Sequence, residues 1–180
     1  MGEPVLVGLS GSLRRGASNR LLIREAARLF GPVRYGEADL NLPLYDGDVE
    51  DAGGIPEAVQ VLADQVAGAD AVVISTPEYN KGLSGVLKNA LDWVSRAGGS
   101  PWRDKPVAVM SAAAGRAGGE RAQTTLRACM VSFQPRILQG PEVHIASSTN
   151  EFDENGRLKS EQYTNTLRRL MQKLRGEAGF

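Results

Sequence analysis

Residues 5–19 read VLVGLSGSLRRGASN, an unbroken apolar run followed directly by a polar, glycine-containing loop. The run Val5–Leu9 shows no polar alternation, which is typical of a strand covered on both faces. Runs of the same kind occur at Ala71–Ser75 and Val107–Ser111. We therefore expect these three segments to be buried strands of one sheet.

Apolar residues at helical spacing separate the strand-like runs. The clearest stripe is Leu83–Val94, with apolar side chains at positions 83, 86, 87, 90, 91 and 94. Weaker stripes occupy 22–29, 59–66, 119–130 and 163–174, and short strands are expected near Val33–Tyr35 and Ile137–Ile145. This alternation predicts an α/β fold with a parallel sheet, helices on both faces and right-handed crossovers.

Composition narrows the class of protein. The chain has 180 residues, 42% of them hydrophobic, and no repeat or long linker, so residues 1–180 are expected to form a single domain. Lys plus Arg number 21 and Asp plus Glu number 21, which disfavours a general binder of nucleic acid or anionic membrane. No apolar run approaches the roughly 20 residues of a membrane helix, and no signal-peptide pattern is seen, so a cytoplasmic protein is expected.

Residues able to hold metal or act as nucleophiles are few. Cys129 is the single cysteine and His144 the single histidine, which disfavours a disulfide, a zinc site and a histidine-based triad. Asp46 and Asp48 are too few for a calcium cage. We expect no metal, a packed Cys129, and chemistry supplied by a bound cofactor.

Ligands of such sheets bind beyond the carboxyl ends of the strands. The segments that follow the three buried strands are Ser10–Asn19, Thr76–Gly82 and Ala112–Arg121. All three are small, polar or glycine-rich, and each leads into an expected helix. They are therefore the candidate binding loops.

The first loop has the composition of a phosphate site. Its short hydrogen-bonding side chains are Ser10, Ser12, Ser18 and Asn19, and Arg14 adds a positive charge. A helix beginning near Ser18 directs its free N–H groups at the loop. The alternative is an ordinary turn in which Ser18 caps the helix.

The spacing of this loop argues against two common nucleotide motifs. Gly11 and Gly16 have P-loop spacing, but Ala17 stands where the lysine would be. The pattern G-x-G-x-x-G is absent, since two residues separate Gly8 from Gly11. A single phosphate, as in flavin mononucleotide (FMN), needs only a short polar loop at a helix start.

The second loop can face a heterocycle. Pro77 stiffens the turn, so that the backbone groups of Glu78, Tyr79 and Asn80 are presented. Tyr79 offers a ring for stacking, and Asn80 could match an imide edge. Alternatively, Tyr79 is a half-buried anchor and Asn80 caps the helix that begins near Leu83.

Four motifs resemble those of the flavodoxin-like NAD(P)H-dependent FMN reductases, which include bacterial quinone, chromate and azo-dye reductases. They are GSLRRGASN (11–19), LPLYDGD (42–48), TPEYNKGLSGVLKNALDW (76–93) and GRAGGER (115–121). The resemblance implies a doubly wound, five-stranded parallel sheet of order 2-1-3-4-5 that binds FMN non-covalently. Ala112–Ala114 depart from the hydroxyl side chains that relatives often have there.

The resemblance also implies a role for each loop. The cofactor-binding residues that it implies are Ser10, Ser12, Arg14, Ser18 and Asn19 near the phosphate, Pro77, Glu78, Tyr79 and Asn80 at the isoalloxazine, and Ser111, Ala112 and Gly115 beside the ring. No side chain is expected to be catalytic, because flavin N5 carries the chemistry. Arg116 and Arg121 are candidates for the adenosine phosphate of NADPH.

The implied activity is hydride transfer from NADPH or NADH through FMN to quinones, flavins, azo compounds or metal oxyanions such as chromate. One pocket serving both substrates in turn predicts ping-pong kinetics. A flavodoxin-type one-electron carrier is the alternative, but Arg14, Arg15 and the neutral chain disfavour it. A regulatory module without turnover is a third possibility.

A homodimer or homotetramer is expected, with Tyr45 near a neighbouring flavin, and with Trp93 and Trp102 in the core or at the contact between subunits.

Overall fold

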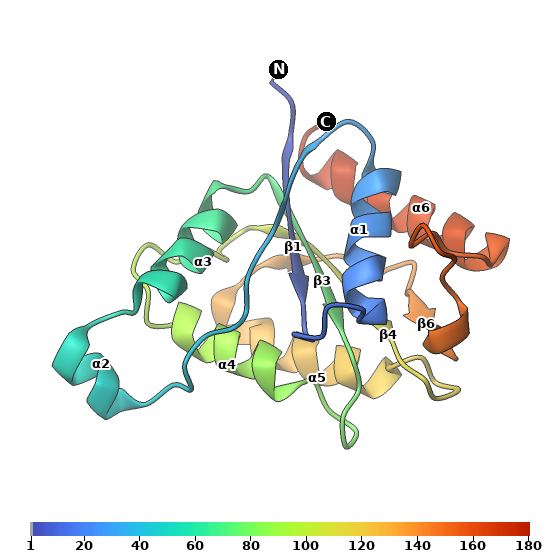
Figure 1. Ribbon diagram of the computed structural model, residues 1–180. Helices are drawn as coiled ribbons and strands as arrows, with labels where there is room; N and C mark the ends of the chain where they lie inside the picture. Colours follow the sequence, from blue (N-terminus) through green and yellow to red (C-terminus); the bar gives the residue numbers. More distant parts are fainter. Residues whose placement is uncertain (1) are drawn as a thin grey trace.

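A parallel sheet forms the centre of the molecule (Figure 1). The computed structural model describes residues 2–180. The strands are β1 (Val5–Ser10), β2 (Arg34–Glu37), β3 (Ala71–Thr76), β4 (Pro106–Ala112), β5 (Arg136–Ile137) and β6 (His144–Ile145). Their order is β2-β1-β3-β4-β5, β6 also pairs with β4, and every pairing is parallel. The predicted fold class and strand order are therefore confirmed.

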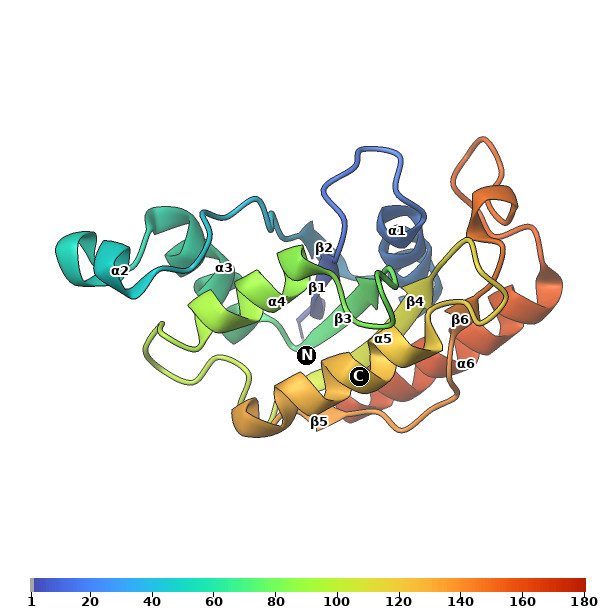
Figure 2. The same cartoon turned by 90° about the horizontal axis from the view of Figure 1, so that it is seen from below.

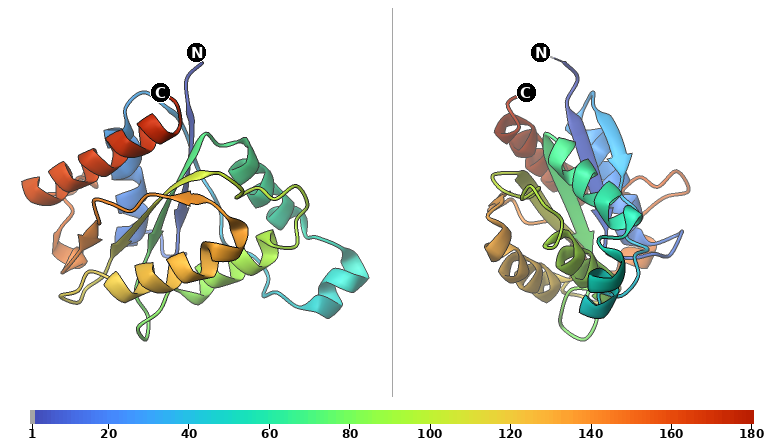
Figure 3. Two further views of the ribbon diagram at one scale, coloured as in Figure 1. Left: turned by 180° about the vertical axis from the view of Figure 1, so that it is seen from behind. Right: turned by 90° about the vertical axis from the view of Figure 1, so that its left-hand side faces the viewer.

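Helices cover both faces of this sheet, as Figure 3 shows in its edge-on view. They are α1 (Ser18–Phe30), α2 (Gly47–Gly53), α3 (Glu57–Gly68), α4 (Gly85–Val94), α5 (Glu120–Met130) and α6 (Glu161–Glu177). Helices α1 and α6 pack together on one face, whereas α3, α4 and α5 lie on the other. The five helices predicted from apolar spacing are all present.

The interior consists of two apolar layers, one on each face of the sheet. Along β3, Val72 and Ile74 pack with α3 to α5, while Ala71 and Val73 pack with α1 and α6. Every residue of β3 is buried, which explains why its sequence lacks polar alternation. Each fully buried Val or Ile side chain contributes about 1.5–3 kcal/mol to this core.

Both tryptophans belong to the interior of the chain itself. Trp93 is 0% exposed and Trp102 is 1% exposed. The indole of Trp93 also donates a hydrogen bond to the carbonyl of Pro43 at 2.8 Å. Of the two places predicted for these residues, the core is confirmed.

The predicted strand Ile137–Ile145 is wrong as a single element. It is two short strands, β5 and β6, which pair with opposite ends of β4: Ile137 lies beside Val107, and His144 beside Ser111. Pro141 lies between them, and a proline has no N–H to continue a ladder. The chain therefore leaves the sheet and returns to it, which makes six strands instead of five.

Helix α2 was not expected from the sequence. None of its residues is buried, and it extends from one end of the molecule (Figure 2). Asp46 caps it by accepting a hydrogen bond from the N–H of Asp48 at 3.0 Å. An exposed seven-residue helix has no apolar stripe by which periodicity could find it.

Candidate functional site

A cleft of about 570 Å³ opens where β1, β3 and β4 end. The loops after these strands lie together along the lower edge of the sheet in Figure 1. Nine predicted site residues line the cleft: Ser12, Arg14, Ser18, Asn19, Pro77, Glu78, Tyr79, Ala112 and Gly115. Its volume falls within the range of small-molecule sites, about 300–1,000 Å³.

The start of α1 forms one end of the cleft. Its N-cap residue is Ala17, which has no side chain able to cap, so the first-turn N–H groups have no side-chain acceptor among residues 2–180. The hydroxyl of Ser18 instead donates to the carbonyl of Ser148 at 3.3 Å, and the alternative in which Ser18 caps the helix is wrong. With Ser12 and the exposed Arg14 beside it, this helix start is suited to a phosphate.

Asn19 joins this helix to two strands. It is only 3% exposed, and its Oδ1 accepts hydrogen bonds from the Ser75 hydroxyl at 2.7 Å and from the N–H of Ala112 at 3.0 Å. Its Nδ2 donates to the carbonyl of Ala112 at 2.9 Å. The Asn19 side chain therefore connects the start of α1 to the ends of β3 and β4.

The first and second loops touch at Gly11. Its N–H donates to the carbonyl of Ser75 at 2.8 Å. A Cβ at this position would lie 2.9 Å from the Ser84 hydroxyl and 3.0 Å from Cδ of Pro77. A side chain would therefore push apart two of the walls of the cleft.

The second loop is a tight hairpin. Tyr79 and Gly82 exchange backbone hydrogen bonds of 3.1 and 3.0 Å, with Asn80 and Lys81 at the tip in the left-handed region. Tyr79 is 55% exposed and lines the cleft, whereas Asn80 lies outside it. Asn80 does not cap α4, because Ser84 does so by accepting from the N–H of Leu87.

Glu78 ties the second loop to the third. Its Oε2 accepts hydrogen bonds from the N–H of Arg121 at 3.1 Å and of Ala122 at 3.4 Å. The N-cap residue of α5 is Gly119, which has no side chain of its own, so Glu78 caps this helix from another loop. A carboxylate at a helix N-terminus is also favoured by the helix dipole.

Ser111 supports the third loop from behind. It is fully buried and lies outside the cleft; its hydroxyl donates to the carbonyl of Gly118 at 2.6 Å and accepts from Nε2 of Gln123 at 2.8 Å. Gly119 has φ 92°, and a Cβ there would lie 2.7 Å from Cβ of Ser111. Gln123 was not predicted, because a polar residue in an amphipathic helix gives no sign that it faces inward.

A fourth segment, also not predicted, completes the cleft. Ser148, Thr149, Phe152 and Asp153 line it from the chain that follows β6. The sequence does hold a signal for it, because the polar stretch Ser147–Asn150 follows a strand as the three predicted loops do.

Two other residues considered in the sequence, Ser10 and Cys129, do not line the cleft. Ser10 lies beside a different cavity, which it shares with Ser12. Cys129 is partly buried against the core, as predicted.

Within residues 2–180, no group of three His, Cys, Asp or Glu side chains is placed to hold a metal ion. None of the helices in this range combines the length and the hydropathy of a membrane span.

The two ends of the cleft match the two chemical parts of FMN, its phosphate and its flat ring system. An uncapped helix start with Arg14 and hydroxyl groups is suited to the phosphate. The exposed face of Tyr79, together with Pro77 and Ala112–Ala114, supplies the small apolar surface that a flat ring system requires.

Comparison with known proteins agrees with this fit. The family model described as NADPH-dependent FMN reductase matches residues 4–150. An NAD(P)H-dependent FMN reductase of Pseudomonas aeruginosa is 43% identical over 171 residues, 94% of this chain and 92% of the relative. A quinone reductase of Escherichia coli K12 is 39% identical over 140 residues, 76% of this chain and 74% of the relative.

A solved structure supports the same assignment. The flavoenzyme NAD(P)H:(acceptor) oxidoreductase FerB of Paracoccus denitrificans superposes with a TM-score of 0.87 at 28% identity, covering 97% of each chain. Because the family model spans most of the sequence and the two relatives match 94% and 76% of it, this chain belongs to the NADPH-dependent FMN reductase family, and it is an oxidoreductase that uses FMN and NAD(P)H.

Proposed function

We propose that this protein transfers hydride from NAD(P)H through non-covalently bound FMN to quinones, with other flavins, azo compounds and metal oxyanions such as chromate as further acceptors. One observation carries the proposal: a single cleft joins an uncapped, arginine-flanked helix start to a half-exposed tyrosine and a run of three alanines. When bound, FMN supplies the hydride-accepting atom and passes electrons on. The named relatives, a quinone reductase among them, support the choice of acceptor.

In this proposal the first loop holds the phosphate. The Arg14 guanidinium and the Ser12 hydroxyl donate to phosphate oxygens, together with the first-turn N–H groups of α1. The Ser18 hydroxyl joins them by exchanging its 3.3 Å hydrogen bond to the carbonyl of Ser148 for one to the phosphate. Charge-assisted hydrogen bonds of this kind are each worth about 1.5–3 kcal/mol. The same arginine distinguishes this loop from the uncharged, hydroxyl-rich phosphate loop of a one-electron carrier.

The second and third loops orient the ring. Pro77 and Tyr79 bound the cleft on one side, and Ala112 and Gly115 on the other. Glu78 acts by holding α5 in place, and Ser111 acts by holding Gly118. Asn80 lies at the tip of the hairpin and does not line the cleft. The predicted contact of its side chain with the imide edge of the flavin therefore stays a prediction.

Assembly into a homodimer or homotetramer is part of the proposal. Leu44 is 82% exposed, and Tyr45 and Val49 next to it are also exposed on the projecting segment that ends in α2. An apolar cluster of this kind favours burial against a second copy, where Tyr45 would border the neighbouring flavin. Light scattering of the purified protein tests the assembly.

We further propose a cytoplasmic location, as for an enzyme supplied with NAD(P)H.

A spectrum and a reduction test the central proposal. The purified protein should show the visible bands of bound FMN, and NADPH or NADH should bleach them under anaerobic conditions. Addition of a quinone should restore the colour with turnover, and initial rates with both substrates varied should give parallel double-reciprocal lines. A colourless protein that does not take up FMN, or a flavin that neither donor bleaches, would refute the proposed activity.

A further inference from the structure

A second cavity of about 510 Å³ lies at the carboxyl ends of β1 and β2, outside the cofactor cleft. The two share Ser12, so the second cavity begins where the phosphate end of the cleft stops. A smaller cavity of about 380 Å³ continues it from Asp39 and Asn41 to Val61. Together they form a groove that leads from the cofactor cleft across the ends of two strands.

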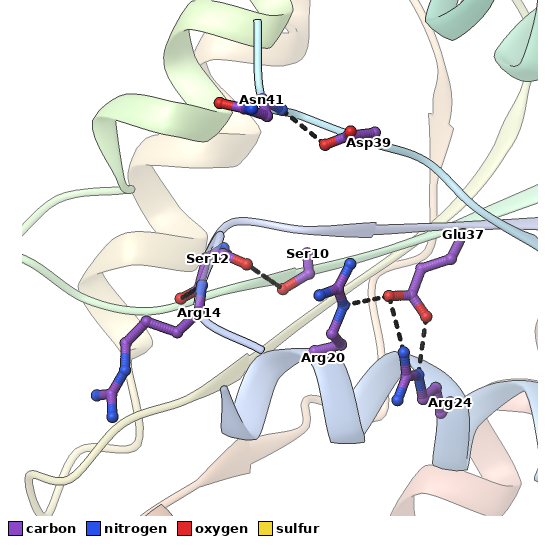
Figure 4. Close-up of polar contacts among 8 residues, drawn as sticks. All are labelled: Ser10, Ser12, Arg14, Arg20, Arg24, Glu37, Asp39 and Asn41. Atoms are coloured by element: carbon purple, nitrogen blue, oxygen red, sulfur yellow. Dashed lines mark hydrogen bonds and ion pairs between the residues drawn. The ribbon is translucent and has the colours of Figure 1, made fainter. Parts of the chain in front are cut away.

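Glu37, the last residue of β2, binds two arginines, of which Arg20 lines this cavity and Arg24 does not (Figure 4). Nε of Arg20 donates to its Oε1, and Arg24 donates to Oε2 at 2.8 Å and to Oε1 at 3.3 Å. Oε1 therefore accepts two hydrogen bonds from arginines and Oε2 accepts one. In Figure 4 the terminal nitrogens of Arg20 point toward the space below Asp39 and Asn41, and they have no partner within residues 2–180.

A second guanidinium is available beside Arg20. Arg15 is exposed, forms no ion pair within residues 2–180, and lines this cavity, whereas its neighbour Arg14 lines the cofactor cleft. Ser10 and Ser12 line the same cavity, and the Ser10 hydroxyl donates to the carbonyl of Ser12 at 3.3 Å. Two guanidinium groups and the Ser12 hydroxyl are donors of the kind that bind a phosphate.

The other side of the cavity can accept hydrogen bonds. Asp39 is exposed, and its Oδ1 accepts a hydrogen bond from the backbone N–H of Asn41 at 2.9 Å. Its Oδ2 and the Asn41 side-chain amide have no partner among residues 2–180 and can bind a ligand. Leu13 and Val61, each about half exposed, add apolar surface along the groove. A phosphate, a sugar and an apolar base would each find a suitable surface here.

The state of Glu37 decides which sugar fits. In dinucleotide-binding sheets, a free carboxylate after the second strand accepts hydrogen bonds from the ribose 2′-hydroxyl, whereas an arginine there accommodates a 2′-phosphate. Arg20 and Arg24 neutralise the charge of Glu37 and already donate three hydrogen bonds to it, and Arg20 lines the same cavity, so this strand end favours a 2′-phosphate over a free 2′-hydroxyl. We infer that this cavity binds the 2′-phosphorylated adenosine end of the donor, so that the enzyme prefers NADPH to NADH; this rests on the proposed function.

Titration of the FMN-loaded protein with adenosine 2′,5′-bisphosphate and with 5′-AMP tests the inference by calorimetry. The bisphosphate should bind at least about tenfold more tightly. Arg15→Ala and Arg20→Gln should each weaken bisphosphate binding about tenfold and leave 5′-AMP unchanged, with kcat/KM falling for NADPH but not for NADH. Arg169→Ala, an exposed arginine of α6, is the matched control.

The outcomes separate this inference from the proposed function. Equal binding of the two nucleotides, or loss of bisphosphate binding in Arg116→Ala or Arg121→Ala but not in Arg15→Ala, would overturn the cavity assignment. If the bisphosphate binds as expected but neither donor bleaches the flavin, the cavity assignment stands and the proposed activity fails. Arg15 lies on an exposed loop, so its variant keeps the test valid should Arg20→Gln not fold.

Discussion

Asn19 Oδ1 lies 2.7 Å from the hydroxyl of Ser75 and accepts its hydrogen bond at the point where α1 begins and β3 ends. The same side chain pairs with both backbone groups of Ala112 at the end of β4. One amide therefore fixes the relative positions of three segments that line the cofactor cleft. The site is built by connections between its loops as well as by the loops themselves.

Asn19→Ala should destabilise the protein strongly. It leaves the buried Ser75 hydroxyl and the N–H and C=O of Ala112 without their partner, and unpaired buried groups cost about 1–3 kcal/mol each. We expect the free energy of unfolding to fall by at least about 3 kcal/mol in urea denaturation of the FMN-free protein. Ser75→Ala, which leaves both Ala112 contacts intact, should cost only about 1 kcal/mol. Equal losses in the two variants would contradict this division of roles.

Glu78→Ala should loosen the third loop without unfolding the protein. It removes the acceptor for the N–H groups of Arg121 and Ala122 and should cost about 1 kcal/mol, as for other lost caps. Because the link between the second and third loops is also lost, the dissociation constant of FMN should rise several-fold. Glu120→Ala removes a charge from the same helix turn without cutting that link, and should leave FMN binding unchanged.

The main features of the fold and the cleft were predictable because they follow from local pattern and parallel topology. Strands such as Ala71–Ser75 lack alternation because both faces are covered, and the loops after them must meet at one edge of the sheet. The caps of the site were not predictable, because Glu78 acts on a helix that begins 42 residues after it, at Glu120. Gln123 and the second cavity depend on the same kind of contact between distant segments.

Arg14→Ala should weaken FMN binding by about ten- to a hundredfold, since one charge-assisted hydrogen bond to phosphate is worth about 1.5–3 kcal/mol. Riboflavin has no phosphate, so its dissociation constant should not change in the same variant. Quenching of flavin fluorescence on binding measures both constants, with Arg169→Ala as the control. A parallel loss of riboflavin binding would mean that Arg14 acts on the shape of the loop and not on the phosphate.

The Glu37 ion pairs should make stability depend on pH in the acidic range. Burial raises the pKa of Glu37, but hydrogen bonds and charges from Arg24 and Arg20 outweigh it and hold the pKa below its ordinary value. A carboxyl whose pKa is lowered in the folded state stabilises the protein above the pKa of the unfolded chain, about 4.3, and this contribution is lost as the pH falls toward the folded pKa. The difference in free energy of unfolding between wild type and Glu37→Gln should therefore be constant near pH 7 and shrink below about pH 4.3.

In an Arg24→Ala background the same comparison should show a smaller change with pH, because one of the two partners that lower the pKa is gone. A difference that grows on acidification would mean that Glu37 is held in its protonated form, and it would also remove the basis for assigning a phosphate to the cavity beside it.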